Sequence, residues 1–483
     1  MIFAKNEKNQ SGFLLVEIML ALAVAVCAIA AAGLMAFAGQ TMSVDSELDA
    51  QALEMAQRLI EEQRILAGDD FRQVNSTSTT EGIFSGRVNV SRYDFFVKSI
   101  SAAVDWNING RNRQTEISAL IADYGNTAGN DTCDSNLTGD WKNPQIVKVI
   151  DFSDFAESAS STYAIGDIDV YKGKLYVAME KTGTKTDATF FVFDVSNPSV
   201  PILSGRIDNN NAAMAGINAI TVNKNYAYAA SATTNQFQII DTFQNPLKLF
   251  SYKINNGSEA ISIFYKNKNI YLGLIKADGP EFNIINATDP ENPQYIAGIE
   301  IGAQVNDIYV KGDYAYLATA DSARELIILD IANPSAPVLF AVYNLLPDQT
   351  NWGYGKSIQI IGDKIYFGRT YIANSPEFYL FDRNQSFINI LGNYSENGVP
   401  FSVNDLIVRD HLAFILAGSA SQGGSLRILD IDDPANIVEE KIIGLPGVAG
   451  GVGGAAMDCE GNYLYAASID GAGKSYISII TAP

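Results

Sequence analysis

A long run of apolar residues near the N-terminus is the strongest pattern in the chain. The 21 residues from Ile18 to Ala38 carry no formal charge, and about 20 apolar residues in a helix span the hydrocarbon core of a bilayer. One carboxylate, Glu17, stands at the edge of this run. Because a charge inside a membrane is costly unless it is paired, the pattern predicts a membrane-spanning helix whose one carboxylate has a partner.

The helical pattern continues beyond the apolar run. Residues 41–66 include no proline or glycine, and Gly68 followed by two aspartates is a typical helix stop. Apolar residues recur at helical spacing at Leu48, Ala52, Met55 and Leu59. We therefore expect a polar leader over residues 1–12 and one helix over residues 13–68, whose second half packs on a small domain.

Residues 69–124 alternate between apolar and polar positions in short segments, a pattern typical of strands. Asn109-Gly110 has the composition of a hairpin turn between two of them. Residues 125–142 are rich in Gly, Asn, Asp and Thr and lose all periodicity. The N-terminal part is therefore predicted to be an α+β module, a long helix with a small antiparallel sheet, followed by a linker over residues 125–142.

Everything after residue 143 is a repeat. An aromatic anchor within a short apolar strand recurs every 43 to 52 residues, at Tyr176, Tyr228, Tyr271, Tyr316, Tyr366, Phe414 and Tyr465. Each anchor has one strand before it and others after it, and four short strands in 40–50 residues are typical of a propeller blade. The last repeat stops before its outer strand, and residues 143–150 resemble the missing strand. We therefore expect an all-β, seven-bladed propeller over residues 143–483, closed by its N-terminal segment.

The repeats resemble LVIVD repeats, a propeller family named for its strand motif. The segments Ile328-Leu329-Asp330-Ile331 and Ile428-Leu429-Asp430-Ile431 come closest to that motif. The resemblance spans about 340 residues. It implies the fold and is almost silent about activity.

The stretch Ser11-Gly12-Phe13-Leu14-Leu15-Val16-Glu17 resembles the N-terminus of type IV prepilins and of the pseudopilins of type II secretion. The resemblance implies that a prepilin peptidase cuts between Gly12 and Phe13 and that the new terminal amine is methylated. It also implies that Glu17 pairs with the terminal amine of a neighbouring subunit. A secretory signal peptide has a shorter apolar core, and a plain membrane anchor leaves Glu17 unexplained. The small sheet is similar to those of minor pilins, although a β-hairpin domain of other ancestry fits it too.

Charge and cysteine content narrow the function classes. The net charge is −21 and no basic stripe is present, which argues against nucleic acid as a partner. Three cysteines are too few for a disulfide framework, and Cys27 lies in the membrane helix. Ring closure brings Cys133 towards the blade that contains Cys459, so we expect these two to form a disulfide.

Catalytic and metal-binding patterns are absent from the sequence. The only histidine, His411, lies in a turn-like segment, and no cysteine cluster has zinc spacing. Two Gly-Lys-Ser segments lack the upstream glycine and the following helix of a phosphate loop. Asp- and Asn-rich runs such as 208–211 are explained by turns as well as by Ca²⁺. We expect no catalytic residues, no metal and no cofactor.

The predicted function is therefore that of a minor type IV pilin-like filament subunit whose propeller is a head for adhesion or ligand recognition. Its partners would be other pilin subunits, the prepilin peptidase, the inner-membrane assembly platform and an unknown surface ligand. It would reside in the inner, cytoplasmic membrane before assembly and then at the cell surface in an extracellular filament. The alternatives are a secretion pseudopilin with a substrate-docking propeller and, ranked last, a tethered hydrolase or lyase.

Overall fold

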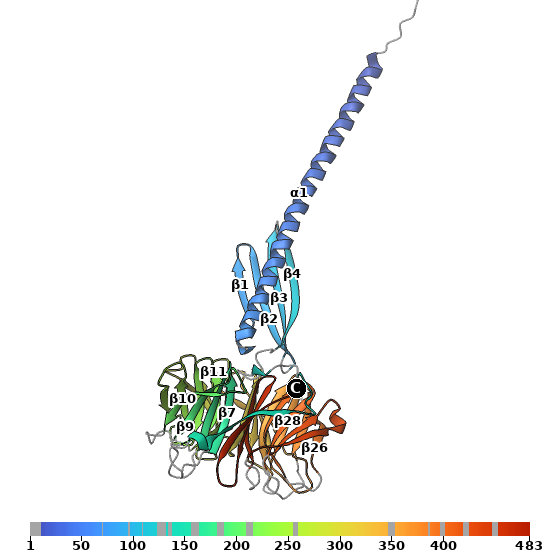
Figure 1. Ribbon diagram of the computed structural model, residues 1–483. Coiled ribbons are helices and arrows are strands. Elements are labelled where there is room, and N and C mark those ends of the chain that lie inside the picture. Colours follow the sequence, from blue (N-terminus) through green and yellow to red (C-terminus); the bar gives the residue numbers. More distant parts are fainter. Residues whose placement is uncertain are drawn as a thin grey trace, which may run out of the picture. The chain divides into compact units, whose positions relative to one another are not determined.

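The computed structural model divides the chain into two compact units (Figure 1). It describes residues 11–69, 71–94, 97–108, 110–122, 132–133, 138–155, 164–180, 188–208, 216–254, 259–345, 353–384, 387–396, 401–418, 425–446 and 453–483. The first unit comprises Met1–Leu66, Val74–Tyr93 and Lys98–Ile121. The second comprises Ala67–Gln73, Asp94–Val97 and Ala122–Pro483.

The first unit combines one long helix with one sheet. The helix α1 spans Ser11–Asp69, and a short 3-10 helix η1 (Phe71–Gln73) follows it. The sheet has the order β1 (Thr77–Glu81), β2 (Phe84–Asp94), β3 (Val97–Ile108) and β4 (Arg111–Ala122). Gly110 has a φ of +77° in the turn before β4, where the sequence predicted a hairpin. A long helix and a small sheet are therefore present in this part of the chain.

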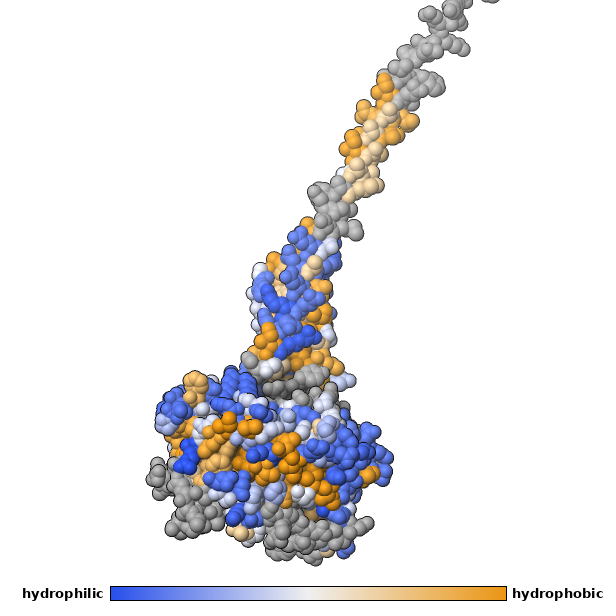
Figure 2. Space-filling model, in the orientation of Figure 1, coloured by the Kyte–Doolittle hydropathy of each residue, from blue (hydrophilic) through white to orange (hydrophobic). Residues whose placement is uncertain are grey.

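The two halves of α1 have opposite surroundings. In its second half, one face is buried within this unit, through Ala52, Met55, Ala56, Leu59 and Ile60. In its first half, Ile18–Met35 is apolar and fully exposed, and it is the one span among the described residues that is long and apolar enough to cross a membrane. Figure 2 shows this stretch as an orange segment of the helix. The apolar helix is therefore suited to be a signal or a membrane anchor.

Seven of the sheets that the structure describes belong to the second unit. The first sheet contains β7 (Ala164–Tyr171), β8 (Lys174–Glu180), β9 (Ala188–Asp194) and β10 (Ile202–Asp208). The second contains β11 (Ile217–Asn223), β12 (Tyr226–Ser231), β13 (Phe237–Asp241) and β14 (Lys248–Tyr252). The third contains β15 (Ala260–Lys266), β16 (Asn269–Leu274), β17 (Phe282–Asn286) and β18 (Gln294–Ile299). The fourth sheet contains β19 (Val305–Lys311), β20 (Tyr314–Thr319), β21 (Leu326–Asp330) and β22 (Val338–Tyr343). The fifth contains β23 (Gly355–Ile361), β24 (Lys364–Arg369), β25 (Phe378–Asn384) and β26 (Phe387–Tyr394). The sixth contains β27 (Ser402–Arg409), β28 (Leu412–Gly418), β29 (Ser425–Asp430) and β30 (Val438–Gly444). The seventh has the order β5 (Thr132–Cys133), β31 (Gly454–Gly461), β32 (Tyr463–Ile469), β33 (Ser475–Thr481) and β6 (Gln145–Asp151). Two 3-10 helices, η2 (Phe152–Phe155) and η4 (Pro434–Asn436), lie in connections.

These seven sheets form a closed ring. The first strand of each sheet contacts the first strand of the next, in the order β7, β11, β15, β19, β23, β27, β31 and back to β7. The apolar clusters lie between neighbouring sheets; one of them combines Phe191 and Phe193 of β9 with Ile477 and Ile479 of β33. Because each sheet buries its apolar faces only against its neighbours, the core is continuous only when the ring is closed.

The make-up of the last sheet differs from the sequence expectation of seven four-stranded blades. The described residues contain eight sheets in all: the small antiparallel sheet β1–β4 of the first unit and the seven sheets of the ring. As the repeat pattern predicted, β6 supplies the outer strand of the last sheet, with Gln145 opposite Thr481 and Asp151 opposite Tyr476. β5, which the sequence pattern does not predict, pairs in parallel with the other edge of that sheet. Two residues are too short a strand for a periodic pattern to predict.

Candidate functional site

The strongest candidate site is the channel at the centre of the ring. It is a cavity of about 220 Å³ lined by side chains from all seven inner strands. Consecutive residues of each inner strand line it, for example Asp167, Ile168 and Asp169 of β7. The polar lining residues are Asp167, Asp169, Thr221, Asp307, Ser357, Gln359, Asp405 and Asp458. Ile220, Phe264, Tyr309 and Leu406 are among the apolar ones.

Three aspartates near the start of their inner strands join neighbouring blades. Asp307 accepts hydrogen bonds from the backbone N–H of Ile308 (2.7 Å) in its own strand and of Ile358 (2.8 Å) in the next. Asp405 bonds in the same way to Leu406 (2.8 Å) and Met457 (2.7 Å), and Asp167 to Ile168 (2.8 Å) and Ile220 (2.8 Å). The repeated geometry makes each carboxylate a tie between two blades and shows that all inner strands run in the same direction.

Further ties follow along the same strands. Asp169, Gln359 and Asp458 accept the backbone N–H groups of Val222, Val408 and Val170 of the following blade. At the far end, Glu460 accepts the N–H of Gly173 at 2.8 Å, which joins the last sheet to the first. Lys311 and Arg409 donate there to the carbonyls of Gly362 (3.0 Å) and Gly461 (2.7 Å). The inner wall is therefore held at several levels by side chains that bond to the next blade.

Burial raises the pKa values of three carboxyl groups at the start of the channel. Desolvation raises the pKa of Asp307 to about 7 and that of Asp405 to about 6, although the backbone N–H groups oppose both shifts. Burial also raises the pKa of Asp167 well above its usual value, and the Asp405 carboxylate adds to this shift. Because no lysine or arginine lines the described part of this cavity, its field favours a cationic group over an anionic one.

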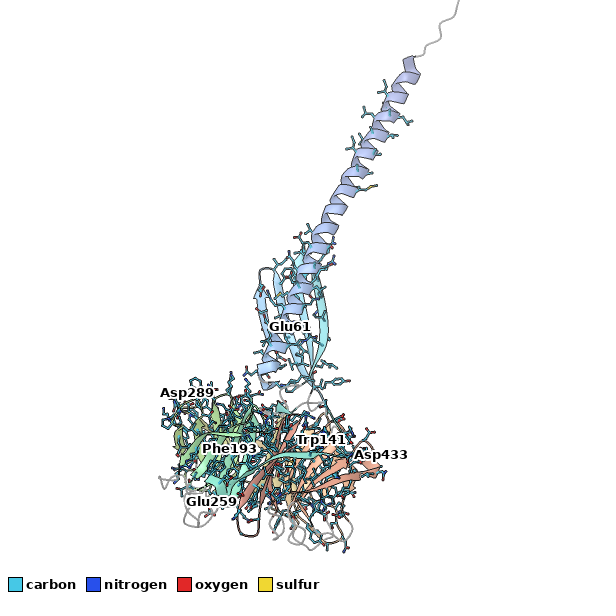
Figure 3. The ribbon with its side chains drawn as sticks, viewed as in Figure 1. Glu61, Trp141, Phe193, Glu259, Asp289 and Asp433 are labelled. Atoms are coloured by element: carbon cyan, nitrogen blue, oxygen red, sulfur yellow. The ribbon has the colours of Figure 1, made fainter. Side chains whose placement is uncertain are left out.

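The two mouths of the channel are different. β5 lies on the channel-side edge of β31 and pairs with Glu460 and Gly461, where that inner strand ends. The incoming chain therefore lies at the mouth where the inner strands end. At the other mouth, Glu259 immediately precedes β15, and Lys356 is the second residue of β23. Figure 3 places Glu259 and Asp289, which lies in the turn after β17, at opposite ends of the ring.

The charged groups at the mouth where the inner strands begin influence one another. Burial raises the pKa of the Glu180 carboxyl, and the neighbouring Glu259 adds to the rise. Burial lowers the pKa of Lys356, while the negative charge of Glu180 acts to raise it. In the part of the chain that the structure describes, this mouth thus combines the carboxylates of Glu180 and Glu259 with the amine of Lys356, in front of the three aspartates.

The structure locates some of the residues singled out from the sequence. Gly12, Phe13 and Glu17 lie in the first turns of α1, and their side chains are outside the described residues. Cys459 is buried and disulfide-bonded, and Cys27 is free. Cys133 pairs through its backbone with Gly461, but its side chain is outside the described residues, so its pairing with Cys459 stays a prediction.

His411 lies in an exposed turn with its Nδ1 3.0 Å from Asp410. It borders a smaller cavity of about 160 Å³ together with Trp141, Lys142 and Glu440. Within the residues that the structure describes, no group of three or more His, Cys, Asp or Glu side chains is arranged to hold a metal ion.

Sequence reasoning missed the carboxylates of the channel. The signal was present, because an aspartate stands near the start of the inner strand in three repeats, at Asp167, Asp307 and Asp405. These strands were recognised, but their aspartates were not assigned a role. Only the ring shows that these aspartates, which are 140 and 98 positions apart in the sequence, meet at one axis.

Comparisons with known proteins agree with the ring. Residues 165–209 and 302–345 match the LVIVD repeat family, and these segments cover most of β7–β10 and β19–β22. The second unit is a propeller, and two of its segments are similar to LVIVD repeats. The matched segments do not reach the N-terminal module, and no comparison assigns it to a pilin family. No curated protein matches the chain.

One of the similar solved structures supports the fold, and it supports nothing beyond the fold. One chain in the crystal structure of the mitotic checkpoint complex matches with a TM-score of 0.50 at 10% sequence identity, covering 70% of this chain and 92% of that chain. A protein from Lactobacillus plantarum matches with a TM-score of 0.46 at 12% identity, covering 73% of this chain and 94% of that chain.

Proposed function

We propose that this protein is a minor subunit of a type IV pilin-like filament that displays its propeller as a binding head. The observation that carries the proposal is the division of α1. Its first half, Ile18–Met35, is apolar and exposed on all sides, while its second half has a buried apolar face in the unit that contains β1–β4. A helix with these two parts can stand in a membrane or among the helices of a filament and still hold a folded domain outside.

The N-terminal residues complete the proposal. Prepilin peptidase would cut between Gly12 and Phe13, and Glu17 would pair with the terminal amine of a neighbouring subunit. Such pairing supplies the partner that a carboxylate needs beside an apolar stretch. The protein would reside in the inner membrane, be extracted by the assembly platform and reach the cell surface in a filament. A large propeller on each subunit would crowd a filament shaft, which favours a minor position.

The binding site of the head would be the channel mouth where the inner strands begin. The other mouth holds the incoming chain at β5. Among the described residues, Glu180, Glu259 and Lys356 lie at this mouth, and the aspartates lie behind them. Because carboxylates outnumber amines among these described residues, a ligand with positively charged groups fits this mouth better than an anionic one.

Mass spectrometry of N-terminal peptides from sheared surface filaments tests the proposal. We expect a mature chain that begins at Phe13 and is heavier by one methyl group. In Gly12→Leu the bulky residue at the cut should leave the chain unprocessed, while Gly33→Leu, whose side chain would enter open space, should be processed normally. A chain that keeps its first 12 residues in the wild type would overturn the proposal.

The second candidate is a pseudopilin of a secretion machine whose propeller docks an exported substrate. The exposed apolar half of α1 fits it equally well. Recovery of the processed chain from cell envelopes, and its absence from sheared filaments, would favour this candidate. A tethered hydrolase or lyase ranks last, and turnover of a glycan panel that one carboxylate substitution abolishes would revive it.

A further inference from the structure

The covalent connection between the N-terminal module and the propeller enters the ring at a single place. After β4 ends at Ala122, the next described residues are Thr132 and Cys133 of β5, which pair with Glu460 and Gly461 at the end of β31. Tension transmitted along the chain from α1 therefore reaches the propeller at β5, beside the inner strand β31 of the last sheet.

A second attachment follows within a few residues. The segment from Thr138 to Asp151, here called the strap, comes after β5 in the sequence and ends at the outer edge of the same sheet. Asn462 exchanges hydrogen bonds with the backbone of Thr138, at 3.2 Å from its N–H and 2.9 Å to its carbonyl. Trp141, which Figure 3 labels, packs edge-on against Phe414 at 4.9 Å and is 4% exposed. Lys142 lies 3.0 Å from Glu440 of the preceding blade.

The strap ends in β6, the outer strand of the last sheet. β6 is held by antiparallel pairing with β33, from Gln145 opposite Thr481 to Asp151 opposite Tyr476. This strand closes the ring, but it is a sheet edge with a partner on one side only. If tension reached it through the strap, its backbone hydrogen bonds would be loaded from the end at Gln145 and could separate one after another.

β31 is much better anchored than β6. It has β32 on one side and β5 on the other, and it contacts both neighbouring inner strands, β7 and β27. Its Cys459 is fully buried and disulfide-bonded. Cys27 is free, and Cys133 is the remaining cysteine of the three in the chain.

We propose that the Cys133–Cys459 disulfide transmits tension from the filament to β31 and so keeps it off the strap. A covalent bond between these residues removes residues 134–151 from the path of the force, because the tension leaves the backbone at Cys133 and enters the ring at Cys459. The strap then has only to close the ring. In the reduced protein the same tension would pass through the strap, peel β6 from β33 and open the last blade. The proposed function enters this inference only by setting the direction of the pull.

Optical-tweezers pulling on the full chain in detergent micelles tests the inference. One handle is attached at the N-terminus and the other at a biotin-acceptor sequence inserted after Ser335, in the turn between β21 and β22. In the reduced protein and in Cys459→Ser we expect an extra extension that the oxidised wild type lacks. Release of the 18 residues from 134 to 151 gives at most about 60 Å, at about 3.5 Å per residue.

The controls separate the disulfide from other effects. Cys27→Ser removes the free cysteine and should behave as the oxidised wild type. If Cys459→Ser does not fold, reduction of the folded wild type gives the same comparison without a substitution. The same extra step in the oxidised wild type, or free thiols at both Cys133 and Cys459, would overturn the inference. An unprocessed N-terminus would refute the proposed function and leave this result unaffected.

Discussion

Single residues show how much buried charge this propeller contains. Arg369 donates through Nε to Glu325 at 2.8 Å, and both side chains are 1% exposed. Arg427 pairs with Glu396 and Glu439, each at 2.5 Å.

Glu377, 3% exposed, belongs to the same region of the fifth and sixth blades. Burial raises the pKa of Glu377 to about 8, although Arg369 and Arg427 act against the shift. Replacing this carboxyl by a neutral group should therefore raise the free energy of unfolding.

We expect Glu377→Gln to stabilise the protein at pH 7 by on the order of 2 kcal/mol. The folded-state pKa lies above that of an unfolded glutamate, about 4.3. The unfolded chain thus ionises first as the pH rises, and the free energy of unfolding of the wild type falls between about pH 4.5 and pH 8. Urea unfolding at pH 4.5, 6 and 7.5 should show the gap between variant and wild type growing with pH.

Asp432→Asn is the matched control for this measurement, because Asp432 is an exposed carboxylate of the same unit. It should leave the pH dependence of the wild type unchanged. A constant difference between Glu377→Gln and the wild type at all three pH values would show that the carboxyl of Glu377 does not stay neutral in the folded protein.

At the scale of elements, the contact between α1 and its sheet includes a closely packed glycine. A Cβ atom at Gly86 of β2 would lie 2.8 Å from Cδ1 of Leu59 and 2.9 Å from Cε of Met55. These distances are shorter than van der Waals contact, so a side chain at this position would force the ends of Leu59 and Met55 to shift. The helix pattern in the sequence predicts the buried face, and the close approach of β2 becomes visible only in the packed unit.

Gly86→Val should destabilise the first unit by about 1–3 kcal/mol, the usual cost of overpacking a core. The branched side chain would push Leu59 and Met55 away from the sheet. Hydrogen exchange, followed by mass spectrometry, should show faster exchange in the second half of α1 than in the wild type. Ser85→Val is the control, because Ser85 is the exposed neighbour on the same strand. Equal exchange in the two variants would contradict the proposed packing.

At the scale of the whole propeller, stability depends on closure. Every inner strand contacts two neighbours, and the last sheet is complete only when β6 joins β33. The Trp141 cluster joins the sixth blade to the last sheet, and the Phe191 cluster joins the last sheet to the first blade. Removing the strand between these clusters should therefore affect more than one blade.

Deletion of residues 475–483 should abolish the cooperative urea transition of the propeller, because it leaves β6 without a partner and exposes both clusters. Limited proteolysis should then cut throughout residues 164–470. Removal of Pro483 alone, which takes away the carbonyl that accepts from Asp140 (3.2 Å), should keep the transition. Cleavage confined to the last sheet and the strap would show that the blades fold independently.

The elements whose pattern is local can be predicted from the sequence alone. The apolar run, the continuing helix and the repeat of short strands follow from periodicities within tens of residues. The strand that closes the last sheet follows from comparing the two ends of the repeat region, because each repeat contains the same four strands. The relation of Gly12, Phe13 and Glu17 to prepilins is equally local and stays a prediction. The channel was beyond such reasoning, because Asp167, Asp307 and Asp405 come together only when blades more than 90 residues apart close into a ring. The burial of Glu377 and the pairing of β5 with β31 were decided by tertiary structure for the same reason: each depends on neighbours that are distant in the sequence.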